Sequence, residues 1–110
     1  MSLSTHVLDT THGCPAAGVA LVLERDGEML FEGATDGDGR CPALKGLGFP
    51  AGRYTLHFAV ADYFRARGIV LPEPPFLDRV RIDFGLADEG AHYHVPLLVS
   101  PFGYSTYRGS

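Results

Sequence analysis

Short runs in which hydrophobic and polar residues alternate are the feature that most constrains the fold of this chain. In residues 53–61, Tyr54, Leu56 and Phe58 fall on one side of an extended strand and the residues between them on the other. Residues 80–86 alternate in the same way. The 14 glycines and 8 prolines are scattered among such runs. This pattern is typical of short strands joined by many turns, and helical periods do not fit it.

Strands are predicted at seven places. Residues 18–24 are almost continuously apolar, which predicts a strand buried on both faces. Asp26 and Gly27 follow, and an Asp-Gly step between two apolar runs is a strong signal for a tight hairpin. The predicted strands cover residues 3–8, 18–24, 29–35, 53–61, 80–86, 92–100 and 104–108.

One segment departs from this β pattern. Asp62 can cap a helix, arginines 65 and 67 lie near its end, and Gly68 can stop it, so residues 62–68 predict a helix of one or two turns. No internal repeat or linker divides the 110 residues. Seven or eight short strands and one brief helix therefore predict a single all-β domain over residues 1–110, built as a β-sandwich.

Charge and hydropathy exclude several kinds of partner. The net charge is −4 and the basic residues do not cluster, so nucleic acid is not expected as a partner. No stretch approaches the roughly 20 apolar residues of a membrane-spanning helix. The first six residues lack a basic start and an apolar core, so no secretory signal is expected and the cytoplasm is the expected compartment. Cys14 and Cys41 fit no zinc motif and are expected to be free thiols.

Common catalytic motifs are missing from the sequence. It has no Gly-x-Ser-x-Gly turn, and residues 37–39 lack the Lys-Ser/Thr ending of a phosphate loop. Asp36 and Asp38 fit a turn better than a calcium loop, because no glutamate closes the spacing. So small a chain has little room for a deep pocket, which makes an interface between subunits a natural place for a site.

The histidines are better candidates for a functional site. His12 and His57 fall in a turn and on a polar strand face, which indicates structural or surface roles. His92 and His94 share one face of a predicted strand, because side chains repeat every second residue. With His6 as a third ligand, this pair could bind zinc or copper.

Four segments carry recognisable motifs. They are residues 3–10 (LSTHVLDT) with 13–16 (GCPA), residues 35–40 (TDGDGR), residues 93–101 (YHVPLLVSP) and residues 104–110 (YSTYRGS). Taken in order, they resemble the family of 5-hydroxyisourate hydrolases, the transthyretin-like enzymes of urate breakdown. The departures are Asp36, where asparagine is common, and the proline-rich residues 72–75.

The resemblance implies a transthyretin-like β-sandwich of two four-stranded sheets with one short helix. It implies a homotetramer whose active sites lie between dimers and draw residues from two chains. The implied reaction opens the ring of 5-hydroxyisourate with water, giving 2-oxo-4-hydroxy-4-carboxy-5-ureidoimidazoline on the way from urate to allantoin. No metal or organic cofactor is implied.

By the same resemblance, the catalytic residues are His6, Arg40, His94 and Ser110, and the substrate-binding residues are His6, Arg40 and Tyr107. The two histidines form an acid/base pair, because histidine exchanges protons near neutral pH. Arg40 offers a planar fork of donors to the ring carbonyls and the oxyanion. Tyr107 helps to seat the ring, and Ser110 orients a histidine or the water through its hydroxyl or the terminal carboxylate. The sequence leaves open which histidine is the base.

Two alternatives stay beside the hydrolase. A non-catalytic transthyretin-like carrier would bind small aromatic ligands in the same channel, but such carriers lack the two histidines, the arginine and the Tyr-Arg-Gly-Ser ending found here. A metal-binding β-sandwich would use His6, His92 and His94 and would hold stoichiometric zinc or copper.

Overall fold

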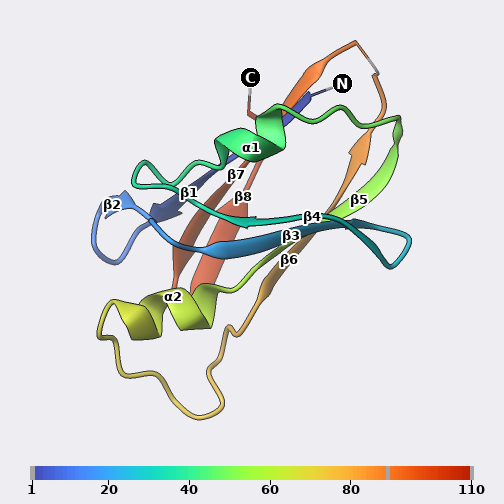
Figure 1. Cartoon of the computed structure of the whole chain (residues 1–110). Coiled ribbons are helices and arrows are strands. Elements are labelled where there is room, and N and C mark those ends of the chain that lie inside the picture. Colours follow the sequence, from blue (N-terminus) through green and yellow to red (C-terminus); the bar gives the residue numbers. More distant parts are fainter. Residues whose placement is uncertain (1, 89, 110) are drawn as a thin grey trace.

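The computed structural model describes residues 2–88 and 90–109, which form two four-stranded sheets packed face to face (Figure 1). One sheet has the strand order β2-β1-β7-β8 and the other β4-β3-β5-β6. The strands are β1 (Ser2–Asp9), β2 (Cys14–Pro15), β3 (Ala20–Arg25), β4 (Glu28–Ala34), β5 (Gly52–Phe58), β6 (Val80–Leu86), β7 (His92–Ser100) and β8 (Gly103–Thr106), and the helices are α1 (Pro42–Lys45) and α2 (Val60–Ala66). The predicted β-sandwich is confirmed.

The parallel pairing of β1 with β7 brings the two ends of the sequence together. The other strand pairs of the described residues are antiparallel. In the β1–β7 pair, Ser4 lies opposite His94, and His6 lies opposite Pro96. A parallel pair needs a long crossover, and here the crossover contains most of the chain.

Alternating burial fixes which side chains of β1 and β7 face outward. Every second residue of the two strands enters the core, including Leu3, Val7, Leu97 and Val99. Burying one such side chain contributes about 1.5–3 kcal/mol, and a slip by one residue would turn them all outward. The core therefore fixes Ser4, His6 and His94 on the outer face of the sheet.

The hairpin between β3 and β4 forms as predicted. Asp26 and Gly27 both have positive φ, 53° and 79°, as a type I′ turn requires. The prediction that residues 18–24 form a strand buried on both faces is wrong, because only Leu21 and Leu23 of β3 are buried while Ala20 is exposed. The remaining side chains of β3 are exposed or half-buried, so burial alternates along this strand.

Helix α2 starts two residues earlier than predicted. Its N-cap is Ala59, and Asp62 lies inside the first turn, where a carboxylate still interacts favourably with the helix dipole. Burial of Val60 and Phe64 decides this start over capping preference. Gly68, at φ 84°, ends the turn after the helix as expected. The one-turn helix α1 was not predicted.

Asp9, at the end of β1, ties this strand to α2 through a buried carboxylate. The Tyr63 hydroxyl donates to its Oδ2 at 2.7 Å, and the backbone N–H groups of Thr11 and His12 donate to its Oδ1 at 2.9 and 3.0 Å. Burial raises the pKa of Asp9, but the hydrogen bonds from Tyr63 and from the backbone and ring of His12 outweigh it and leave the pKa below its usual value. Burial and the Asp9 carboxylate raise the pKa of Tyr63 to about 12, so the phenol stays a donor at neutral pH.

Replacing this tyrosine should destabilise the fold in a pH-dependent way. Tyr63→Phe is expected to lower the free energy of unfolding by about 1.5–3 kcal/mol at pH 7, the range for a hydrogen bond to a charged group. Because the pKa of folded Asp9 is lowered, its stabilisation is full above the unfolded pKa of about 3.9 and is lost as the pH falls through the folded value. Urea unfolding from pH 7 to pH 3 measures this, with exposed Tyr104→Phe as the control. A loss that stays constant down to pH 3 would contradict the role of the carboxylate.

Candidate active site

His6 and His94 lie on the outer face of the β2-β1-β7-β8 sheet, and both are half-buried. His94 is opposite Ser4, two residues before His6. With strands about 4.8 Å apart and a rise of about 3.3 Å per residue, the two histidine Cα atoms are about 8 Å apart. Two titratable rings thus share one surface, as the acid/base prediction requires.

Arg40 arrives beside His6 from the loop that follows β4. It forms an isolated antiparallel bridge with His6, and the Val7 N–H donates to the Gly39 carbonyl at 2.8 Å. The Asp36 carboxylate shapes the loop by accepting the Arg40 N–H at 3.1 Å. Since β7 occupies one edge of β1, this loop lies along the opposite edge. The structure therefore gathers His6, Arg40 and His94, while the Arg40 residue stays exposed.

The surroundings of His94 suit a base. Burial lowers the pKa of His94, and the nearby charges of Arg40, His6 and His92 lower it further. A lowered pKa favours the neutral ring at pH 7, which is the form that can accept a proton. Its Nδ1 is hydrogen-bonded to the Ser4 hydroxyl at 2.8 Å, which leaves Nε2 as the nitrogen available for chemistry.

The end of the described chain packs against His94. Although β8 ends at Thr106, before the predicted residue 108, the Gly109 N–H donates to the His94 carbonyl at 2.8 Å. A Cβ atom on Gly109 would lie 2.5 Å from His94 Cδ2, so the ring occupies the space that a side chain would need. Just before it, the Arg108 guanidinium lies 4.2 Å from the centroid of the Tyr93 ring, a cation–π contact. These contacts hold the tail beside the histidine.

Tyr107 lies apart from the three grouped residues. It is 60% exposed and lines a cavity of about 210 Å³ together with Tyr93 and Val95, whose side chains face the core side of β7. Its role in seating the substrate stays a prediction. Ser110, the remaining predicted catalytic residue, lies outside the described residues.

The other histidines and the cysteines have separate surroundings. His12 contacts the Asp9 carboxylate, and His57 lies beside Glu24 on the other sheet, consistent with structural roles. His92 and His94 share a face as predicted, but residues 2–88 and 90–109 contain no group of three or more His, Cys, Asp or Glu side chains that could hold a metal ion. Cys14 and Cys41 are free. Within the same ranges, no helix has the length and apolarity to cross a membrane.

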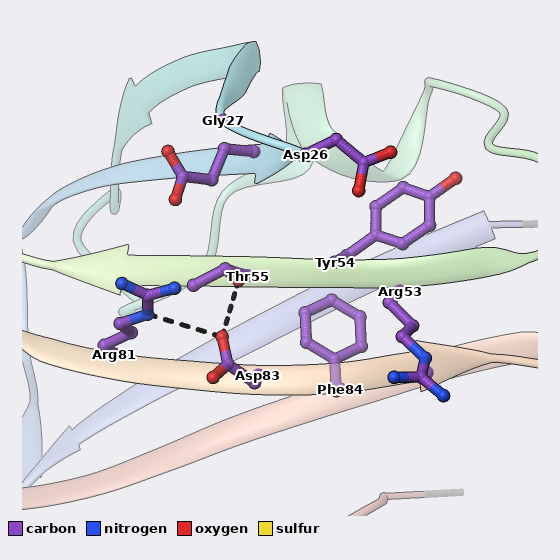
Figure 2. Close-up of a pocket in the computed structure, with 10 residues that line it drawn as sticks. Asp26, Gly27, Arg53, Tyr54, Thr55, Arg81, Asp83 and Phe84 are labelled. Atoms are coloured by element: carbon purple, nitrogen blue, oxygen red, sulfur yellow. Dashed lines mark hydrogen bonds and ion pairs between the residues drawn. The ribbon is translucent and has the colours of Figure 1, made fainter.

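A hollow of about 560 Å³ beside β5 and β6, on the other sheet, contains none of the predicted site residues (Figure 2). The Asp83 carboxylate in this hollow accepts hydrogen bonds from the Thr55 hydroxyl at 2.6 Å and from Arg81 Nε at 3.4 Å. These hydrogen bonds lower the pKa of Asp83 below its usual value. A carboxylate so engaged is a poor proton acceptor, so the hollow offers less for acid/base chemistry than the surface of His6 and His94.

Ser4 and Gly109 contact His94. Both lie in the family motifs, but neither was predicted as a site residue. Ser4 and His6 are two residues apart on β1, so their side chains lie on the same face of the strand. Nothing local signals that β1 lies beside β7, and that pairing is what makes Ser4 a neighbour of His94.

Gly39 holds the Arg40 loop in place, and a side chain there should dislodge it. Its φ is +74°, and an added Cβ would lie 2.4 Å from the Val7 carbonyl oxygen. Gly39→Ala is expected to cost at least about 1–3 kcal/mol of stability from the backbone strain alone. Gly37→Ala, in the same loop with open space around it, is the matched control. Equal unfolding midpoints in urea for the two variants would contradict this.

Known proteins match the chain over nearly its whole length. The model of the HIUase/Transthyretin family matches residues 3–109. The chain is 59% identical to a 5-hydroxyisourate hydrolase of Mesorhizobium japonicum, over 98% of this chain and 91% of that protein. It is 54% identical to a 5-hydroxyisourate hydrolase of Pseudomonas aeruginosa, over 98% of this chain and 90% of that one.

Solved structures agree with the fold. An (S)-allantoin synthase superposes with a TM-score of 0.93 at 40% identity, and the match covers 99% of this chain but only 43% of that longer one. The 5-hydroxyisourate hydrolase of Klebsiella pneumoniae gives a TM-score of 0.85 at 39% identity, covering 99% and 93% of the two chains. Sea bream transthyretin in complex with thyroxine gives 0.85 at 32% identity, covering 99% and 95%.

Proposed function

The chain belongs to the HIUase/Transthyretin family, and from this premise we propose that it is an enzyme that hydrolyses 5-hydroxyisourate. Water opens the ring of the substrate and gives 2-oxo-4-hydroxy-4-carboxy-5-ureidoimidazoline in the degradation of urate to allantoin. The observation that carries this proposal is the grouping of His6, Arg40 and His94 on one sheet face, because they come from three separate segments of the chain.

Each of these residues has a proposed role. His94 takes a proton from the attacking water, which is the role that its lowered pKa favours. Arg40 donates to a ring carbonyl and stabilises the oxyanion that forms there, worth about 3 kcal/mol for a well-placed donor. His6, beside Arg40, orients the water or protonates the leaving nitrogen. Tyr107 and Ser110 complete the site by seating the ring and orienting a histidine or the water.

The test follows the decay of enzymatically generated 5-hydroxyisourate by its ultraviolet absorbance. We expect decay far above the spontaneous rate, and a fall in kcat/KM at acid pH as His94 becomes protonated. Because the pKa of His94 is lowered, this fall should come below the usual histidine value of about 6.5. A rate equal to the spontaneous one would refute the proposal.

A carrier of small ligands is the second candidate, favoured by the likeness to sea bream transthyretin. It would bind aromatic ligands on the same sheet face without turnover. Stoichiometric ligand binding by a protein that leaves the decay of 5-hydroxyisourate unchanged would support the carrier.

We also propose that the chain assembles as a homotetramer in the cytoplasm, with active sites between dimers. Support comes from β8, which is an edge strand whose four residues are all exposed. Large aromatic rings are exposed within it at Tyr104 and next to its ends at Phe102 and Tyr107. Open strand edges and exposed apolar surface are typical of subunit interfaces. Light scattering should give about four times the 11.9 kDa of one chain; a monomer would contradict the assembly.

A further inference from the structure

Two serines and two histidines form a hydrogen-bonded row on the outer face of β1 and β7. The Ser4 hydroxyl lies 2.8 Å from His94 Nδ1 and 2.9 Å from His92 Nε2. The other nitrogen of His92, Nδ1, lies 2.5 Å from the Ser2 hydroxyl. Ser4 is thus the only link in this row between the proposed base and a second histidine, and His92 itself is exposed.

The Ser4 hydroxyl couples the protonation of the His92 and His94 rings. Ser4 has one proton, so it can donate to one ring and must accept from the other. Either His94 is protonated on Nδ1 and donates to Ser4, which donates to His92 Nε2, or the row runs in the opposite direction. Only the first arrangement leaves the lone pair of His94 Nε2 free to take a proton.

We propose that Ser4 and His92 are positioning residues that hold His94 with Nδ1 protonated and pass that proton between the two rings during the reaction. This inference rests on the proposed hydrolysis. Gly109 covers the Cδ2 edge of the ring and Ser4 holds Nδ1, so the ring is fixed from two sides.

The proton count closes over one turnover. Water gives a proton to His94 Nε2 while its oxygen bonds to the ring carbonyl carbon. The Nδ1 proton then moves to Ser4 as the Ser4 proton moves to His92 Nε2, which leaves a neutral His94 protonated on Nε2 and a positive charge on His92. That Nε2 proton goes to the leaving nitrogen as the C–N bond breaks, while His92 Nε2 returns its proton to Ser4 and Ser4 returns its proton to His94 Nδ1, which restores two neutral rings. One histidine can therefore act first as base and then as acid.

Local charges favour moving the positive charge away from His94. The groups whose charges act on His94 are His6 on β1, Arg40 on the loop after β4, and His92, which lies on β7 with His94. The Arg40 guanidinium is positively charged and opposes a second positive charge beside it. His92 is exposed, so water stabilises the charge there.

The first test removes the hydroxyl that joins the two histidine rings. Ser4→Ala is expected to lower kcat about 10- to 100-fold with little change in KM, a part of the ~10²–10⁴ that a general base provides. In Ser4→Ala, the fall of kcat/KM at acid pH should move to lower pH, because protonated His94 loses an acceptor for Nδ1–H. Thr55→Ala, which removes a hydroxyl from β5 in the other sheet, should keep kcat within about twofold. Ser4→Thr should restore kcat because the hydroxyl returns. Unchanged kcat and pH profile in Ser4→Ala would overturn the proposal.

The second test does not depend on activity. Long-range ¹H–¹⁵N spectra at neutral pH distinguish the tautomers of His94, and we expect Nδ1–H in the wild type and a shift toward Nε2–H in Ser4→Ala. A wild-type ring protonated on Nε2 would overturn the relay even if the enzyme is active. A wild-type protein with the expected tautomer and no hydrolysis would instead refute the proposed function.

Discussion

Arg40→Ala is expected to lower kcat/KM for 5-hydroxyisourate about 100- to 1000-fold, the usual cost of removing one oxyanion donor. The free energy of unfolding should hardly change, because the residue is exposed and its loop is shaped by backbone contacts of Gly39 and by the Asp36 carboxylate. Residual activity should also respond differently to pH. Without the guanidinium charge the pKa of His94 rises, so the acid limb of kcat/KM moves to higher pH.

Arg40→Lys separates the charge of this residue from its shape. Lysine keeps the positive charge, so the acid limb should stay near its wild-type position, but it lacks the planar fork and should still lose activity. Arg53→Ala, an exposed arginine on the other sheet, is the control and should behave as the wild type. Full activity in Arg40→Ala would remove this arginine from the proposed mechanism.

Gly109→Ala is expected to reduce kcat/KM about 100-fold. The new Cβ would lie 2.5 Å from His94 Cδ2, so either the ring or the tail must move. A displacement of about 1 Å at a catalytic group can cost this much. Unfolding in urea should show a much smaller effect, because the tail can swing away without opening the core. The steady-state ultraviolet assay and an unfolding curve on the same sample measure both.

Gly103→Ala is the matched control for this substitution, because a Cβ there meets only the Ser100 hydroxyl oxygen at 3.9 Å. Deleting residues 107–110, or adding a tag after them, should reproduce the loss seen in Gly109→Ala. Normal activity in the deletion would show that the tail has no part in the site.

Much of the fold could be predicted because its signals are local. The alternation in β5, β6 and β7 and the Asp26-Gly27 turn gave strands and a hairpin close to those observed. The errors arose where packing overrode local preference. Helix α2 starts at Val60 because Val60 and Phe64 are buried, although Asp62 is the better cap. Residues 18–24 are almost continuously apolar, but only alternate side chains of β3 are buried.

By itself the sequence determined the kinds of residue available for chemistry, the side of each strand on which they fall, and the family motifs that contain them. Only the tertiary structure decided which of them meet. The parallel pairing of β1 and β7 places Ser4 against His94 across nearly the whole chain, and the bridge to Arg40 and the Gly109 contact add two further segments. Side-chain periodicity is a property of neighbouring residues, whereas strand register depends on burying Leu3, Val7, Leu97 and Val99 together. The site is therefore a consequence of that shared core.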